Sequence, residues 1–568
     1  MAPPPSSAKE NEFTTPVHPP LVLADTERAD WLDEADIVLV GFGSAAAVAG
    51  LQAREDGASV LALDRFGGGG TTAISGGIIY AGGTKYQRAS GFNDTAEEMY
   101  KYLFFEGMAV QPDTLKRYCD TSAENLEWLS GHGVQFGTGV YPYSTTYPPD
   151  GYFLYYSGME KARPEVAYVA PRGHRTVGKG MTGKNYWAAV RDAAFGQGVR
   201  LMQHSPVRRL VMDANGRVIG VECQIIPREY WKKHDALYRR VTPYRPLNGV
   251  RSEQAVQDCR AFEEEIPQQR ALVRAHRAVI VASGNYTYNL KFLGRYRPEF
   301  EQCYREIVRM GTMGDDGSGV ELGLSAGGQL ACMDAAVLSR PTYPPLAYVT
   351  GALVNLEGRR YINEDANYSV LGQATSEQKD YAAWLIIDSR TFWKGIRQLL
   401  PPGQMFSLFG TPAFLNILFG GTRKARTIGE LARKCRMSPD NQLAATIAAY
   451  NEGVAKESDA LGKRAENLGA VVRGPFYAVN MSLRNKWNMS SGMPFGGLKV
   501  DEETGAIVRA DGSPVPGLFA CGRCTVGMSS RTTFSGLSLG DTVFSGRRAA
   551  RSAVRGEIPT GHKQQLAQ

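Results

Sequence analysis

Long apolar runs are missing from this chain of 568 residues, and several other diagnostic patterns are missing with them. No stretch of about 18 apolar residues occurs, and we therefore expect no membrane-spanning helix. The N-terminal segment has no basic patch followed by an apolar core, so we expect no secretory signal. The net charge of +7 is spread along the chain without a compact basic run, and we expect no nucleic-acid partner.

Cysteine is also scarce. Eight cysteines in a chain of this length do not make a disulfide scaffold, so we expect a reduced protein in the cytoplasm. Cys521 and Cys524 form a lone C-x-x-C, which we interpret as a packing pair in preference to a redox pair, and we predict no metal site. The motif C-x-x-C-H does not occur, which excludes a c-type haem attachment.

Residues 35–64 carry the strongest positive signal. The apolar run 37–40 predicts a buried parallel strand, and it ends in the G-x-G-x-x-A turn Gly41-Phe42-Gly43-Ser44-Ala45-Ala46. A helical stretch and a second apolar strand at 59–63 follow, and Asp64 closes the unit about 20 residues after the glycines. This order is typical of a dinucleotide site, in which the glycines let the backbone approach a pyrophosphate and the acid binds a ribose hydroxyl.

A glycine-rich segment after Asp64 favours FAD over NAD. Residues 67–83 hold eight glycines, too many for a regular helix or strand, and large apolar side chains between them argue against a floppy linker. Such a loop suits close approach of the backbone to a flat ligand and its phosphates. Because no histidine lies in or near this loop, we expect the FAD to be bound without a covalent link.

Two segments far from this loop in the sequence also combine an apolar run with small residues that follow it. Residues 277–281 predict a buried strand that ends in Ala282-Ser283-Gly284, and residues 516–520 predict another, followed by Cys521-Gly522-Arg523. With the opening turn, the glycine loop and the closing Ser538-Leu539-Gly540-Asp541, they resemble the flavoprotein superfamily of fumarate reductases and 3-ketosteroid dehydrogenases, most closely the Δ4-(5α)-dehydrogenases. The resemblance runs from about residue 36 to about residue 556.

The resemblance implies an α/β fold, with a Rossmann-type FAD-binding domain built from both ends of the chain and an inserted α+β capping domain that is catalytic. We predict a disordered segment at 1–30, an FAD-binding domain made of residues 31–286 and 471–558, a capping domain at 287–470 and a flexible tail at 559–568. The predicted cofactor-binding residues are Gly41, Gly43, Ser44, Ala45, Ala46, Asp64, Arg65, Gly69, Thr71, Thr72, Ser75, Gly76, Gly77, Ala282, Ser283, Gly284, Gly522, Arg523, Ser538 and Leu539.

Residues 224–272 interrupt a predicted hairpin. The strand at 218–226 should return through a short turn to the strand that contains Ala278, but about 45 residues rich in Arg, Lys, Tyr and Glu intervene. We interpret this excursion as a solvated surface segment. An oligomer contact, or a peripheral membrane contact through the aromatic and lysine side chains at 230–233, is the alternative.

The residue that moves a proton is diagnostic, because a flavin exchanges only the hydride with its substrate. Residues 354–369 resemble the hairpin that delivers the proton group in this superfamily. Fumarate reductases place an arginine shortly after the Asn-Glu pair, whereas here Tyr368 follows Asn363-Glu364. A phenol is a poor clamp for anions, so Tyr368 favours a ketosteroid-like substrate over a dicarboxylate. The alternative is a tyrosine that only packs.

The other predicted catalytic residues follow Arg531. Ser535 could relay a proton or contact substrate, and the Gly536 N–H could polarise a substrate ketone; contact with the flavin is the alternative for both. The tyrosine that the resembling dehydrogenases carry here is replaced by Thr533, and a threonine hydroxyl is far too weak an acid to replace a phenol of pKa about 10. Either Tyr368 handles the proton with a relay, or the acidic carbon of the substrate lies elsewhere.

Histidine usage bears on the substrate as well. None of the seven histidines lies between Asn285 and Thr560, the region from which fumarate reductases clamp a carboxylate with histidine and arginine. Only Arg531 is left as a possible anion binder there. A separate aromatic cluster at 141–156, with six tyrosines and one phenylalanine, could form a lid over a pocket or a surface loop.

We therefore predict an FAD-dependent oxidoreductase that dehydrogenates a C–C bond next to a ketone in an apolar, 3-ketosteroid-like substrate. The hydride goes to flavin N5, the proton goes to Tyr368, and a separate electron acceptor reoxidises the flavin. Three alternatives stay open. They are an enone reductase that runs the reverse reaction, a fumarate- or urocanate-type carboxylate reductase that uses Arg531, and a non-catalytic flavin-binding scaffold.

Overall fold

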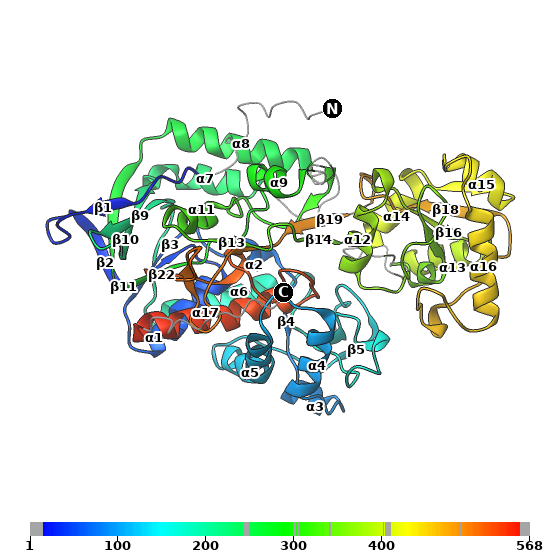
Figure 1. Ribbon diagram of the computed structural model, residues 1–568, viewed down its shortest axis with the longest axis horizontal. Coiled ribbons are helices and arrows are strands. Elements are labelled where there is room, and N and C mark those ends of the chain that lie inside the picture. The colour runs from blue at the N-terminus through cyan, green and yellow to red at the C-terminus, as the bar shows by residue number, and fades with distance from the viewer. Residues whose placement is uncertain are drawn as a thin grey trace.

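The computed structural model describes residues 15–241, 249–298, 306–339, 344–401, 410–488 and 490–556, together with residues 301, 303, 342 and 403. Within these residues the largest sheet has nine strands, in the order β1-β9-β10-β11-β2-β3-β8, with β22 paired to β11 and β21 to β22 (Figure 1). The strands are β1 (Leu21–Leu23), β2 (Trp31–Val40), β3 (Val60–Leu63), β8 (Arg200–Met202), β9 (Val207–Asp213), β10 (Val218–Ile225), β11 (Gln269–Val281), β21 (Ala506–Val508) and β22 (Pro514–Ala520).

The predicted βαβ unit forms the centre of this sheet. β2 and β3 pair in parallel from Ile37↔Val60 to Val40↔Leu63, and α1 (Ser44–Glu55) crosses between them. The alanine-rich α1 is buried along most of its length and packs against α17 (Leu537–Arg555) from the far end of the chain. A Cβ at Gly546 of α17 would lie 2.8 Å from the Ala45 carbonyl oxygen, so only glycine allows this approach. This domain is therefore built from both ends of the chain, as predicted.

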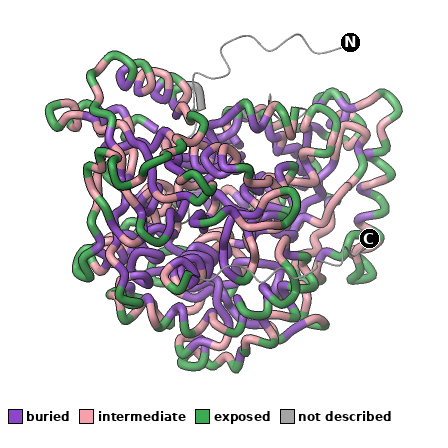
Figure 2. Tube along the Cα trace, turned by 60° about the vertical axis from the view of Figure 1, so that its left-hand side comes forward, coloured by how far each residue is buried: buried purple, intermediate pink, exposed green. Residues whose placement is uncertain are grey.

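Two apolar cores sandwich the sheet. One face packs against α1, α17 and α6 (Gly183–Gly196), and the other packs against α11 (Ser318–Ser325). The central strands are buried on both faces, as their continuous apolar runs predict, and the buried trace is concentrated in the interior in Figure 2.

A smaller lobe follows the glycine loop. Its four-stranded sheet has the order β4-β7-β6-β5, and α17 crosses beside β4. The elements are α2 (Gly70–Ile74), β4 (Ile78–Tyr80), α3 (Lys85–Ala89), α4 (Ala96–Glu106), α5 (Pro112–Gly131), β5 (Val140–Ser144), β6 (Leu154–Tyr156) and β7 (Gly173–Arg175).

The inserted α+β domain lies to one side of the sheet (Figure 1, right). Its sheet has the order β15-β16-β18-β17, from β15 (Ala352–Val354), β16 (Trp384–Ile387), β17 (Arg423–Ala425) and β18 (Phe476–Asn480). Its helices are α12 (Tyr368–Ser376), α13 (Ser389–Leu399), α14 (Gly410–Phe419), α15 (Ile428–Lys434) and α16 (Leu443–Ala455).

Short strands join the two domains. β12 (Val308–Arg309) and β14 (Ala336–Ser339) flank β19 (Ser491–Pro494), and β13 (Leu330–Ala331) pairs with β20 (Gly497–Leu498). α11 packs on the nine-stranded sheet, whereas β18 lies inside the inserted sheet. We therefore propose that the capping domain runs from about residue 342 to about residue 488, so that it begins and ends later than the range 287–470 predicted from the sequence. Single-turn helices span Glu160–Ala162, Arg228–Tyr230, Leu346–Thr350, Lys379–Tyr381, Ala465–Asn467 and Gly522–Cys524.

The predicted disorder of residues 1–30 is wrong for residues 15–30. β1 pairs in parallel with β9 from Leu21↔Val211 to Leu23↔Asp213, and the Thr15 N–H donates to the Asp316 carboxylate at 2.8 Å. Composition suggested disorder, but pairing with an existing sheet edge satisfies the backbone of a segment that has little apolar content of its own. Residues 1–14 and the predicted tail at 559–568 lie outside the described residues.

The excursion at 224–272 does begin and end as a hairpin. β10 pairs with β11 from Gly220↔Arg274 to Ile225↔Gln269, and between them stand α7 (Trp231–Tyr238) and α8 (Gly249–Glu265), with α9 (Leu290–Tyr296) beyond β11. The prediction of a solvated surface segment holds for one side of these helices only, because α7 and α8 bury a face that includes Leu237, Val256 and Phe262. Sequence periodicity missed this face because charged residues are interspersed along it.

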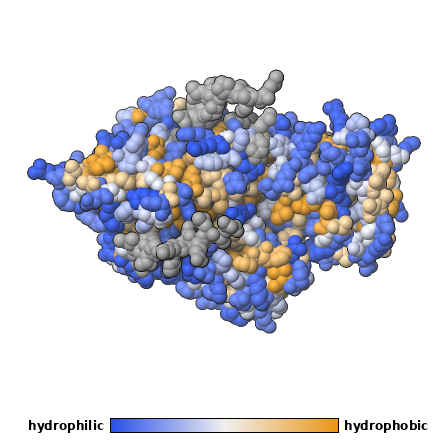
Figure 3. All heavy atoms as spheres, viewed as in Figure 1, coloured by the Kyte–Doolittle hydropathy of each residue, from blue (hydrophilic) through white to orange (hydrophobic). Residues whose placement is uncertain are grey.

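The face of the molecule in Figure 3 carries both apolar and hydrophilic residues, with the apolar residues in small groups among the hydrophilic ones. Among the helices that the structure describes, none combines the length and the apolar character needed to cross a bilayer.

Candidate functional site

A pocket opens where β2, β3 and β11 end, the edge at which a Rossmann sheet binds its ligand. Predicted residues that line it are Gly41, Gly43, Ser44, Ala45, Asp64, Arg65, Gly69, Thr71, Thr72, Ala282, Ser283, Gly284 and Arg523. Predicted residues outside its lining are Ala46, Ser75, Gly76, Gly77, Gly522, Ser538 and Leu539. Lining residues that the motifs did not indicate include Phe66, Tyr238, Thr312, Asp315 and Asp316.

The first turn of α1 suits a pyrophosphate. Gly41 has φ +95, and a Cβ there would lie 2.9 Å from the Ala282 carbonyl oxygen, so the turn requires glycine. The N-cap residue Gly43 has no capping side chain and no acid stands in the first turn, although the Thr72 hydroxyl accepts the Ser44 N–H at 3.1 Å. The positive end of the helix, with the N–H groups that follow Ser44, suits an anionic ligand in the pocket.

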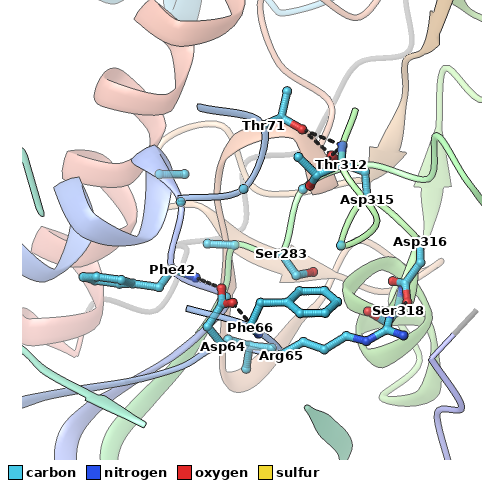
Figure 4. Close-up of a pocket in the computed structure, with 18 of the residues that line it drawn as sticks. Phe42, Asp64, Arg65, Phe66, Thr71, Ser283, Thr312, Asp315, Asp316 and Ser318 are labelled. Atoms are coloured by element: carbon cyan, nitrogen blue, oxygen red, sulfur yellow. Dashed lines mark hydrogen bonds and ion pairs between the residues drawn. The ribbon is translucent and has the colours of Figure 1, made fainter. Parts of the chain in front are cut away.

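Asp64 lies on the pocket wall beyond this turn (Figure 4). Its carboxylate accepts the N–H groups of Phe42 and Phe66 at 2.8 Å each and of Gly68 at 3.3 Å. Burial raises the pKa of Asp64, and the three N–H donors oppose that shift. A carboxylate has about four acceptor positions, so Asp64 can hold the loop and still accept a ribose hydroxyl.

Asp315 orders the opposite wall. It accepts the Arg523 guanidinium at 3.0 Å and the Thr312 N–H at 2.8 Å, and the Thr71 hydroxyl also donates to it. A Cβ at Gly284, which has φ +83, would lie 2.3 Å from this carboxylate. Arg523 is thus fixed beside the pocket, where its charge suits phosphate oxygens. Sequence reasoning missed this role of Asp315, since nothing in the neighbouring residues shows which arginine an aspartate will meet.

Ser75, Gly76 and Gly77 meet a different part of the molecule. The Gly76 carbonyl accepts the hydroxyls of Tyr147 at 3.1 Å and Thr182 at 2.8 Å, and a Cβ at Gly77 would lie 2.7 Å from the Thr182 carbonyl carbon. Tyr147 of the aromatic cluster therefore packs on the glycine loop.

A second constellation forms where three distant segments converge at the start of α12. The Asn367 side chain caps α12 by accepting the Ser369 N–H at 2.9 Å, and its amide donates to the Ser157 carbonyl at 3.1 Å. The Ser369 hydroxyl donates to the Thr533 carbonyl at 3.0 Å. Tyr368, 8% exposed, is thereby held between the segment after β6 and the loop before α17.

Tyr155 supplies a phenol that sequence reasoning did not single out. Its hydroxyl donates to the Ser535 Oγ at 2.8 Å, and Tyr368 is close enough to influence its ionisation. Burial raises the pKa of Tyr155 well above 10, the Ser535 hydrogen bond opposes the shift, and Tyr368 adds to it. Tyr155 is therefore a protonated donor. Its only sequence signal was membership of the cluster at 141–156.

Gly536 is the N-cap of α17 and has φ +103. Its carbonyl accepts the Tyr80 N–H at 3.1 Å, and a Cβ would lie 2.8 Å from the Tyr80 nitrogen, so a side chain cannot be placed here. Ser538 and Leu539 stand in the first turn that follows and are half-buried. This turn presents the positive end of a long helix to the region beside Ser535.

A buried ion-pair network fixes the hairpin before Tyr368. Glu364 accepts Arg360 at 2.9 and 2.8 Å, the Lys463 ammonium at 2.7 Å and the Leu353 N–H at 2.7 Å. The hairpin turns at Gly358, which has φ +69, a conformation that favours glycine. Because Glu364 is fully buried, this end of the hairpin has one well-defined position relative to α12.

Other predicted features are placed as follows. Arg531 is exposed and lies near Cys332, where its charge lowers the pKa of the thiol against the larger effect of burial, which raises it. Cys521 and Cys524 are free thiols with no exposed surface, and burial raises the pKa of Cys524 to about 12, which makes it a poor nucleophile.

Comparison with known proteins agrees with this architecture. The chain is 33% identical over 536 residues to a 3-oxo-5-alpha-steroid 4-dehydrogenase of Comamonas testosteroni, with 91% of this chain and 98% of that protein covered. It is 26% identical over 572 residues to a 3-oxosteroid 1-dehydrogenase of Mycobacterium tuberculosis, covering 88% and 94% respectively. The structure of a 3-ketosteroid-delta4-(5alpha)-dehydrogenase from Rhodococcus jostii in complex with 4-androstene-3,17-dione matches with TM-score 0.78 and 30% identity, over 94% of this chain and all of that one.

The family model described as FAD binding domain matches residues 36–539. The resemblance inferred from the motifs and the choice of FAD as cofactor are both confirmed. The chain belongs to the FAD binding domain family of flavoprotein oxidoreductases.

Proposed function

We propose that the protein dehydrogenates a 3-ketosteroid-like substrate at a C–C bond next to the ketone, in the 4,5-position. The observation that carries the proposal is the convergence of Tyr155, Tyr368 and Ser535 beside the first turn of α17. The similarity to steroid 4-dehydrogenases over nearly the whole chain supports this substrate class.

Dehydrogenation removes one proton and one hydride from adjacent carbons and leaves one C=C bond. When bound, FAD supplies the hydride acceptor at N5. Tyr368, acting as a phenolate, accepts the proton from the carbon α to the ketone and becomes a phenol; the Asn367 cap fixes the start of α12, which carries this residue. The carbon next to it loses the hydride.

The ketone must be polarised if its α-carbon is to lose a proton. The Gly536 N–H and the first turn of α17 present donors and the positive end of the helix to the developing oxyanion. Preorganised donors of this kind lower such a barrier by about 3 kcal/mol. Tyr155 stays protonated and donates to Ser535, so the Ser535 hydroxyl is free to point its own proton toward substrate or Tyr368.

The carboxylate-reductase alternative is weaker in this geometry. Its clamp would be Arg531, and that residue is exposed and lies near Cys332. Two phenols and a serine hydroxyl offer hydrogen bonds without a positive charge, so they suit a ketone better than a dicarboxylate. The individual FAD-binding residues, a separate electron acceptor and a peripheral membrane contact through residues 224–272 stay predictions.

Anaerobic flavin bleaching tests the proposal. The holoenzyme is mixed in a stopped-flow instrument with a saturated 5α-reduced 3-ketosteroid, and the photoreduced enzyme is mixed separately with fumarate. We expect rapid loss of the visible flavin band with the steroid, a 4-ene product, and no reoxidation by fumarate. Reoxidation by fumarate without reduction by any steroid would overturn the proposal.

A further inference from the structure

The excursion formed by α7 and α8 covers one end of the FAD pocket. Figure 1 shows the two helices side by side above the sheet. Asp64 marks the ribose position at the end of β3, so pocket residues beyond Asp64 lie on the adenosine side. Phe66 follows Asp64 by two residues, and Tyr238 is the last residue of α7. Both residues line the FAD pocket.

Aromatic contacts join α7 to this wall. The Tyr238 ring lies 4.4 Å from the Phe66 ring, measured between centroids, and His234 stacks on Phe66 at 4.7 Å. Phe66 is almost fully buried by these rings, whereas Tyr238 is half-buried and faces the pocket. A flat, π-rich ligand edge such as adenine matches this wall.

Ion pairs join α8 to the residue after Asp64. The Arg65 guanidinium contacts Glu263 of α8 at 2.8 and 3.0 Å and Asp316 at 3.1 Å, as Figure 4 shows for Asp316. Both carboxylates are buried to 1% exposure. His234 of α7 adds a contact of 2.9 Å to Glu263, and His204 contacts His234 at 2.9 Å. Because Arg65 lines the pocket and both its partners are buried, its position depends on α8 being in place.

The same contacts argue against a metal site in this segment. Glu263, His234 and Cys259 have ligand atoms within 4.8 Å of one another, but Arg65 occupies both Glu263 oxygens, which is an ion pair and not a vacant metal site. The Trp231 indole is turned inward, since it stacks on His204 at 4.5 Å and donates to the Ile226 carbonyl at 2.8 Å.

We propose that α7 and α8 form a clasp over the adenosine half of FAD. Tyr238 contributes a ring to the adenine wall, and Glu263 holds Arg65 against the ribose side of the pocket. The clasp governs how slowly FAD leaves the protein, and it acts at the end of the pocket defined by Asp64, away from Tyr155 and Tyr368. The inference depends on the FAD site and is independent of the steroid substrate.

Cofactor release and binding of ADP test the clasp. FAD dissociation is followed by the fluorescence of released FAD in Glu263→Gln and in the matched control Glu264→Gln, whose side chain is 65% exposed and pairs only with Arg260 among the contacts described for it. We expect release at least about tenfold faster in Glu263→Gln and unchanged in the control. Because ADP carries only the adenosine and pyrophosphate, its dissociation constant for the apoprotein should rise by a similar factor.

Tyr238 gives an independent pair of variants that does not disturb a buried charge. Tyr238→Ala should weaken FAD and ADP by about tenfold, and Tyr238→Phe, which keeps the ring, should stay within about threefold of the parent. If Glu263→Gln does not fold, this pair decides. Release rates within about twofold of the parent in Tyr238→Ala would overturn the clasp. So would weaker FAD binding with ADP binding unchanged, since the defect would then lie at the flavin end.

Discussion

Replacing Tyr368 with phenylalanine removes one hydroxyl from the place where the capping domain meets the FAD-binding domain. The Asn367 cap and the Ser369 contact with the Thr533 carbonyl do not involve that hydroxyl, so the start of α12 keeps its position. The FAD pocket lining does not include Tyr368, and the visible flavin spectrum should therefore be unchanged.

The expected magnitude follows from the role of the phenol. A positioned general acid or base contributes about a hundredfold to ten-thousandfold, equivalent to about 3–5 kcal/mol of barrier. Tyr155→Phe removes the hydroxyl that donates to Ser535 at 2.8 Å and, at the longer distance of 3.4 Å, to the Thr146 carbonyl. The loss of about 1 kcal/mol should slow the reaction about tenfold. Because the two phenols act through one proton path, the double variant should be little slower than Tyr368→Phe alone.

The assay is single-turnover bleaching of the flavin by a saturated 3-ketosteroid under anaerobic conditions. Tyr361→Phe is the matched control. It lies on the same hairpin, and its hydroxyl contacts Thr375 at 2.9 Å. That variant should lose about 1 kcal/mol of stability and keep its bleaching rate.

A bleaching rate in Tyr368→Phe within about threefold of the parent, with the flavin spectrum intact, would remove Tyr368 from proton transfer. A large loss in Tyr361→Phe as well would show that the assay reports general damage to the hairpin. Fully additive losses in the double variant would refute a shared proton path.

Three further predictions concern buried groups. Burial raises the pKa of Glu160 from 4.5 to about 7. The stability that this group contributes is therefore full below pH about 4.5 and is lost as the pH rises through 7. Glu160→Gln should remove roughly 3 kcal/mol of this pH dependence, as measured by urea titrations at a series of pH values. Glu364→Ala leaves Arg360 and Lys463 buried without their shared partner and should cost about 3–5 kcal/mol in the same titrations; a loss below about 1 kcal/mol would contradict the network. Cys521 and Cys524 should resist a thiol reagent in the native protein and react after unfolding, since burial holds the pKa of Cys524 at about 12; rapid reaction of the folded protein would show that they are accessible.

Local patterns predicted the regions of the fold in which neighbours in sequence are neighbours in space. The unit from β2 to Asp64 follows from apolar runs, two glycines and an acid, because a parallel strand pair with a crossover helix is specified within about 30 residues. The turn at Gly358 and the helix caps are equally local. The remote strand β22 was recognised because its C-terminal half is buried and its apolar run there is unbroken.

Tertiary structure alone brought Tyr155 to Ser535, 380 residues further along the chain, and set both beside Tyr368. It also turned α7 and α8 inward, through a contact between Arg65 and a carboxylate 198 residues away. The periodicity of apolar residues in a sequence reveals which side of a helix or strand is buried, but not which distant segment covers it. The covering segment depends on how both domains pack as a whole, and this packing brings the residues of the site together.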